Sequence, residues 1–90
     1  IGRYHFLRKS FEWANYKIIE SINKNPEWLI IDELGKLELK GEGLHDSSIK
    51  IINELNLYST KLILVIRDYL LDEILTHYQI NEDLTELLEL

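Results

Sequence analysis

The chain has no cysteine and no methionine, and its 90 residues include only one proline and four glycines. Without cysteine it can form neither disulfides nor thiolate metal sites, which is compatible with a cytoplasmic protein. Basic residues are also scarce: ten Lys and Arg stand against sixteen Asp and Glu, for a net charge of -6. This balance argues against binding to nucleic acid or to an anionic membrane, because both need a clustered basic face.

Long apolar runs are missing as well. The longest, Leu62 to Ile66, is far shorter than the ~20 residues that a membrane span needs. A hydrophobic fraction of 46% and a charged fraction of 29% are ordinary for a globular protein. The length suffices for one modest core, so we treat residues 1–90 as a single α/β domain. Because the sequence opens on Ile1 within an apparent strand, we interpret it as a fragment of a larger domain.

The hydrophobic pattern predicts strands that alternate with helices. Strands are expected over residues 1–7, 27–32 and 61–66, and the last two are apolar on both faces, as in a parallel sheet covered on both sides. Helices are expected over residues 11–23 after a Ser10 cap, after an Asp46 or Ser47 cap, over 68–78, and from Asn81 onward. Residues 35–43 are expected to be an irregular connection. This alternation is typical of an α/β fold with a parallel sheet.

The segment EWLIIDELGKLEL places two carboxylates, Asp32 and Glu33, directly after an apolar strand. Parallel sheets bind ligands at the carboxyl ends of their strands, so the pair lies at the expected ligand edge. There one carboxylate can hold Mg2+ through a coordinated water, and the other can activate the water that attacks a phosphate. Neighbours along a strand point to opposite sides, which favours such a division of roles. Strands also end in polar residues simply because they emerge into solvent, and that alternative stays open.

The residues WLIIDELGKLEL, 28–39, resemble the Walker B region of the nucleoside-triphosphatases of the THEP1 type, where an apolar strand ends in Asp-Glu-Ile-Gly-Lys-Met-Glu-Leu. Leu34 and Leu37 replace the Ile and the Met, and the other positions match. Upstream, IGRYHFLRKSFEWANYKI is similar to the strand and helix start of that family. The resemblance implies part of a P-loop NTPase-like fold with three α/β/α layers, and Mg2+-dependent hydrolysis of ATP- or GTP-type nucleotides. In it Asp32 would hold the metal through water, and Glu33 would polarise the nucleophile.

The family's Walker A loop, a glycine-rich turn of the pattern G-x-x-x-x-G-K-S/T that cradles the phosphates, does not occur in this sequence. The Gly35-Lys36 pair is followed by Leu37, which cannot complete the pattern. We therefore expect the parent protein to be a nucleoside-triphosphatase, and this 90-residue chain alone to be inactive.

Three further charged residues are candidates for contact with the nucleotide. Lys36 can reach a phosphate or pair with Glu38, and both are otherwise expected to be solvated charges in an exposed loop. Arg67 ends the last strand at the ligand edge, where it can contact a phosphate or pair with Asp68 or Asp72.

Two other functions compete with this interpretation. The chain can be a truncated, non-catalytic α/β module that acts by self-association or by binding a partner protein. Lacking a central strand, its sheet would have a bare edge at which a homodimer can form. A receiver-like or other flavodoxin-type domain also binds Mg2+ with clustered acids, but it needs an acidic cluster after the first strand, and GRYHFL has none.

Overall fold

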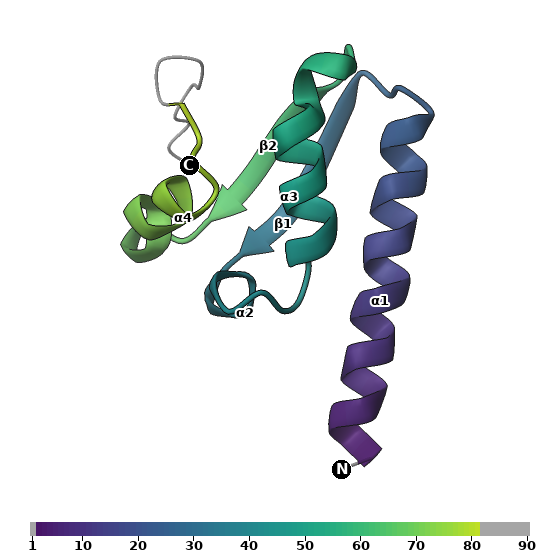
Figure 1. Cartoon of the computed structure of the whole chain (residues 1–90), viewed down its shortest axis with the longest axis vertical. Coiled ribbons are helices and arrows are strands. Elements are labelled where there is room, and N and C mark those ends of the chain that lie inside the picture. Colours follow the sequence, from purple (N-terminus) through teal and green to yellow (C-terminus); the bar gives the residue numbers. More distant parts are fainter. Residues whose placement is uncertain (1, 82–90) are drawn as a thin grey trace.

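The structure is a computed structural model that describes the backbone of residues 2–81 and the side chains of residues 8–81. Figure 1 shows a long helix standing beside a small sheet, with shorter helices against the sheet. The helices are α1 (Gly2–Asn23), α2 (Lys36–Leu39), α3 (His45–Glu54) and α4 (Leu71–His77), the strands are β1 (Trp28–Leu34) and β2 (Lys61–Ile66), and the 3-10 turns are η1 (Leu55–Leu57) and η2 (Asp68–Leu70). The helix expected after Asn81 lies outside the described residues.

The two strands form a parallel sheet, in which Trp28 lies opposite Lys61 and Ile31 opposite Leu64. The connection between them runs through α2, α3 and η1, which makes a β-α-β unit. β2 has the predicted bounds, and β1 begins one residue later than expected and extends to Leu34. The α/β class and the parallel direction predicted from the apolar runs are therefore confirmed.

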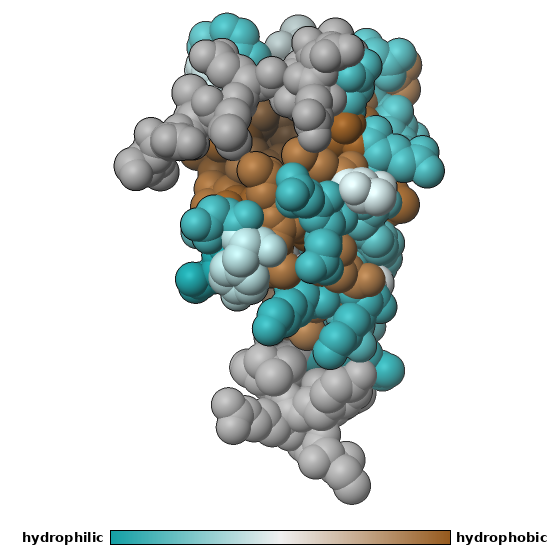
Figure 2. Space-filling view, turned by 90° about the vertical axis from the view of Figure 1, so that its left-hand side faces the viewer, coloured by the Kyte–Doolittle hydropathy of each residue, from teal (hydrophilic) through white to brown (hydrophobic). Residues whose placement is uncertain are grey.

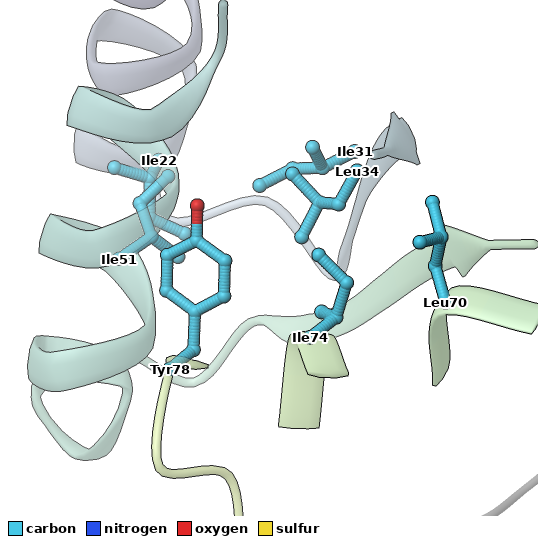
Figure 3. Packing of buried hydrophobic residues seen from close by; sticks show 7 residues of the cluster. All are labelled: Ile22, Ile31, Leu34, Ile51, Leu70, Ile74 and Tyr78. Atoms are coloured by element: carbon cyan, nitrogen blue, oxygen red, sulfur yellow. The ribbon is translucent and has the colours of Figure 1, made fainter. Parts of the chain in front are cut away.

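A single hydrophobic core lies between the sheet and the helices. It takes residues from α1, β1, α3, η2 and the end of the described chain around α4, and Figure 3 shows how they converge, with the Tyr78 ring beside α3. The buried members are Ile22, Ile31, Leu34, Ile51, Leu70, Ile74 and Tyr78. From the strands, Leu29, Leu62, Leu64 and Ile66 pack against this cluster, so one face of the sheet is covered.

The opposite face of the sheet is open in the described part of the chain. Trp28 is 51% exposed, Ile30 60% and Val65 40%, although all three are large apolar residues. Every described helix contributes to the one core on the first face, so the expected covering of the second face stays a prediction. Residues 2–81 form two layers, and the three-layer arrangement stays a prediction for a complete domain.

The first expected strand is wrong. Residues 2–7 belong to α1, which runs without a break to Asn23, so Ser10 lies inside the helix and does not cap it. A strand needs a neighbour for its backbone N–H and C=O groups, whereas a helix pairs them internally. No proline or glycine interrupts residues 3–23, so nothing stops the helix predicted over 11–23 from extending backward.

The start of α3 also differs from expectation. The helix begins at His45, and its first turn has no cap from its own side chains. Instead, the backbone N–H of Ser47 donates to Asn15 Oδ1 of α1 at 2.9 Å, so a distant side chain provides the capping oxygen. The connection over residues 35–43 is less irregular than predicted, because it contains the short helix α2.

Candidate functional site

Both parallel strands end at the same edge of the sheet, where the structure has an open hollow of about 410 Å³. Its walls come from the ends of β1 and β2, from α2 and from the turn after β2. The hollow brings together all the site residues named from the sequence, and adds two aromatic residues that the sequence did not single out. Those lining residues are Asp32, Glu33, Lys36, Glu38 and Arg67, with Phe11 and Tyr69.

A bulge in β1 sets the positions of the two neighbouring carboxylates. Between Ile31 and Leu34, β1 has one more residue than the facing stretch of β2. Within it Glu33 has a φ of 64°, in the left-handed region that residues other than glycine rarely adopt. The simple alternation of a strand no longer applies here, and Asp32 and Glu33 line the same hollow. Such strain costs about 1 to 3 kcal/mol and tends to occur at functional sites.

Glu33 forms an ion pair across the strand ends. Arg67 Nε donates to Glu33 Oε1 at 2.7 Å, and the two side chains are 63% and 55% exposed. This hydrogen bond, together with the charge of Glu33, raises the pKa of the Arg67 guanidinium above its ordinary value. The expected pairing of Arg67 with Asp68 or Asp72 is wrong, because the Asp68 carboxylate instead accepts a hydrogen bond from the backbone N–H of Tyr69 at 2.8 Å.

Glu38 is a buried wall of the hollow, with only 4% of its surface exposed. Its Oε1 accepts the backbone N–H of Gly35 at 2.7 Å, and its Oε2 accepts that of Leu44 at 2.8 Å. Gly43 lies so close, at a φ of 61°, that a Cβ there would collide with the Glu38 carboxylate. The expectation of a solvated charge therefore fails for Glu38, whose carboxylate joins the end of β1 to the start of α3. Its contact with a nucleotide stays a prediction.

Asp32 and Lys36 are the free charges of the hollow. Both are exposed, and neither forms a hydrogen bond or an ion pair with another described side chain. The expected pairing of Lys36 with Glu38 does not form, since Glu38 is occupied by two backbone N–H groups. Of the acids that line the hollow, Asp32 is thus the one with both carboxylate oxygens available to a cation.

Asn15 of α1 supports the loop at the hollow, a role that the sequence analysis did not predict. Its amide nitrogen donates to the carbonyl oxygens of Phe11 and Gly43, both at 2.9 Å. Its amide oxygen is the group that caps α3 at Ser47. The one available signal was a polar residue beside the apolar stripe of a helix. Asn15 fixes the loop that carries Gly43, and through it the seat of Glu38.

A second polar cluster lies behind the hollow, between α3 and α4. His45 Nδ1 and the Tyr78 hydroxyl form a 2.8 Å hydrogen bond, and the His77 ring meets Tyr78 edge-on at 4.7 Å. Burial raises the pKa of Tyr78 to about 12, and the negative charges of Glu38 and Asp46 act in the same direction. The cluster anchors α4 to α3, since Tyr78 is also part of the core.

An α/β unit with a parallel sheet and charged residues at its strand ends is compatible with part of a P-loop NTPase-like fold. The comparison with protein families is more specific. A family model described as NTPase matches residues 1–88, and the chain belongs to this NTPase family. The match is consistent with the resemblance to THEP1-type nucleoside-triphosphatases noted for residues 28–39. Neither the curated proteins nor the solved structures contain a match to the chain. No helix in the described residues is long and apolar enough to cross a membrane.

Proposed function

We propose that residues 1–90 form the carboxylate-bearing half of a Mg2+-dependent nucleoside-triphosphatase site that hydrolyses ATP- or GTP-type nucleotides. One observation carries the proposal: Asp32 and Glu33 lie at the carboxyl end of the parallel strand β1 and share a hollow with the cations Lys36 and Arg67. Membership of the NTPase family supports the reaction class. The cytoplasm, suggested by the absence of cysteine, is the compartment we propose.

The residues present fit Mg2+ when part of its coordination comes from water and phosphate. In the described residues no group of three or more His, Asp or Glu is placed to hold a metal. Mg2+ needs no such group, because proteins usually bind it through one or two carboxylates, with water and substrate phosphates completing the shell. Asp32 is the residue that would hold the ion, through water. When bound, Mg2+ would offset the negative charge of the phosphates.

The chain's own side chains would divide the remaining work. Glu33 is placed to orient the attacking water and accept its proton. Arg67 holds Glu33 through Nε, which leaves its two terminal nitrogens for phosphate oxygens. Lys36 adds a second cation at the rim. Glu38 holds the loop around these groups through its hydrogen bonds to Gly35 and Leu44, and a direct contact with the nucleotide would be a secondary role.

A phosphate cradle is the missing half of such a site. The glycine-rich Lys-Ser/Thr loop that would supply it is not encoded in these 90 residues, so it has to come from residues outside them. Without it, we expect the chain alone to show weak nucleotide binding and no turnover. Calorimetry with ATP or GTP, in the presence and absence of Mg2+, tests this expectation directly.

The decisive variant is Glu33→Gln, in a protein that contains this chain together with a phosphate-binding loop. Loss of the general base should lower turnover by roughly 10²- to 10⁴-fold, while nucleotide binding is largely kept. Glu42→Gln is the matched control, because Glu42 is an exposed glutamate that does not line the hollow. Wild-type turnover in Glu33→Gln would show that the assigned role is wrong.

Self-association is a second candidate function, favoured by the shape of the sheet. The described sheet has two strands, so each strand has one edge without a strand partner. Open edges tend to pair with other chains. Light scattering on the chain tests this function, and a clean monomer at high concentration would contradict it.

A further inference from the structure

The backbone conformation of Glu33 needs support from the rest of the structure. Between Ile31 and Leu34, β1 has one more residue than β2, and these two flanking residues are fully buried in the core. Glu33 lies in this extra length with a φ of 64°, which a glutamate keeps only where its surroundings fix it. The exposed ion pair with Arg67 is too weak to do this alone, because water and salt screen such pairs.

Glu38 provides the support at the end of the bulge. Polar side chains lie at the surface on the side of the molecule that carries α4 (Figure 2), whereas Glu38 is the one described carboxylate that is buried. Its Oε1 accepts the backbone N–H of Gly35, two residues after Glu33, at 2.7 Å. Hydrogen bonds to a carboxylate are stronger than neutral ones, and burial strengthens this one further. The backbone is therefore fixed before Glu33 by the core and after it by this hydrogen bond.

The carboxylate of Glu38 is itself held in place. Its second oxygen, Oε2, accepts the backbone N–H of Leu44 at 2.8 Å. The loop that carries Leu44 is tied to α1, because the amide nitrogen of Asn15 donates to Gly43 O and its amide oxygen accepts the N–H of Ser47. The support at the bulge thus rests on a loop that is anchored to a long helix.

We propose that Glu38 is a positioning residue for the general base: by holding the end of the bulge, it keeps Glu33 in the left-handed conformation that places its carboxylate in the hollow. Release of the Gly35 N–H would let residues 32–35 relax toward an ordinary strand, in which neighbouring side chains point to opposite sides. Asp32 and Glu33 would then no longer line the same hollow. The inference rests on the proposed hydrolysis and adds to it the residue that sets the position of the base.

The test uses a protein that contains this chain together with a phosphate-binding loop, and it compares two glycine variants. In Gly43→Ala the new Cβ would collide with the Glu38 carboxylate and displace it, whereas in Gly41→Ala the Cβ meets nothing within 4 Å, also at a positive φ. Gly43→Ala should lower kcat about 10- to 100-fold and leave nucleotide affinity unchanged, because small misplacements of a catalytic group have effects of this size. Gly41→Ala should keep the wild-type kcat.

Glu38→Ala removes the support altogether and should lower kcat at least as far as Gly43→Ala does. Ile51→Ala controls for lost stability, since Ile51 is a buried core residue of α3 that does not line the hollow. Turnover is compared at a temperature at which circular dichroism shows each variant to be folded. A wild-type kcat in Gly43→Ala and Glu38→Ala overturns the inference, and so does a loss of affinity with unchanged kcat.

A double-mutant cycle separates positioning from a general structural effect. If Glu38 acts through Glu33, Gly43→Ala should cause no further loss of kcat in a Glu33→Gln background, because the displaced group is then no longer a base. Losses that multiply in the double variant overturn the inference and leave the proposed hydrolysis intact. Wild-type turnover in Glu33→Gln alone overturns both.

Discussion

Nε of Arg67 lies 2.7 Å from Oε1 of Glu33, so the residue after β2 is tied to a residue inside the bulge of β1. Both side chains are more than half exposed, and ion pairs of this kind contribute little to stability. The value of the pair lies in orientation, because it fixes a long, flexible glutamate at the edge of the hollow. It also aligns the guanidinium, whose remaining N–H groups keep their hydrogen-bonding capacity.

The backbone strain at Glu33 can be measured by substitution. Glu33→Gly should be more stable than Glu33→Ala by about 1 kcal/mol, because both remove the carboxylate and only glycine adopts a φ of 64° without steric cost. Urea denaturation of the two variants gives the difference. Equal stability, or a more stable alanine variant, would mean that the left-handed conformation at this position is not maintained.

The buried carboxylate of Glu38 should be essential to the loop. Glu38→Gln replaces one acceptor oxygen by an NH2 group that faces a backbone N–H, so we expect a loss of about 2 to 4 kcal/mol in the free energy of unfolding. Glu42→Gln, an exposed change of the same type in the same loop, should cost almost nothing. Similar losses in the two variants would contradict the structural role of Glu38.

A comparison of two glycines separates the effect of packing around Glu38 on stability from the effect of backbone conformation. Gly41 and Gly43 have φ values of 79° and 61°, so alanine is strained at either position. A Cβ on Gly41 meets nothing within 4 Å, whereas one on Gly43 would collide with Glu38. Thermal unfolding should therefore show a larger loss for Gly43→Ala than for Gly41→Ala, and equal losses would place Glu38 elsewhere.

Alkaline titration should expose the buried tyrosine. The pKa of Tyr78 is raised from its ordinary value of 10.0 to about 12, so the folded chain holds this proton more tightly than the unfolded chain. The resulting stabilisation is fully present below pH 10 and is lost between pH 10 and 12, on the order of 2 kcal/mol. Denaturation at several pH values measures how steeply the free energy of unfolding falls with pH in this range. Tyr78→Phe should make this fall less steep, and an unchanged fall would mean that other groups cause it.

The apolar runs of the sequence were sufficient to predict the two strands and their parallel arrangement. The segment KLILVI forms β2 and EWLII supplies the first part of β1, as predicted. Short apolar runs rich in β-branched residues favour a strand over a helix. The end of α1 followed from the residue before Pro26, which is disfavoured in a helix. The Asp32 and Glu33 pair was found because its position directly after an apolar run can be read from the sequence.

The sequence alone could not predict the features that depend on contacts between residues far apart in the chain. The strand expected over residues 1–7 failed because alternation in a short segment cannot show whether a partner strand exists. The pairing of Arg67 with Glu33, 34 positions away, required the register of β1 against β2. Burial of Glu38 was equally hidden, since the two backbone groups that it binds belong to a loop whose shape the charges alone do not specify.

The amide of Asn15 links segments far apart in the chain, with hydrogen bonds to residues 28 and 32 positions away. A loop held only by its own residues could open by itself, but this one cannot move without breaking contacts to the long helix. Local unfolding is governed by the smallest set of contacts that must break together. The middle of α1, the loop around Gly43 and the first turn of α3 therefore form one cooperative unit. The loop that shapes the hollow therefore keeps its structure only while α1 stays packed against it. Loss of the long helix from its place would also disrupt the site.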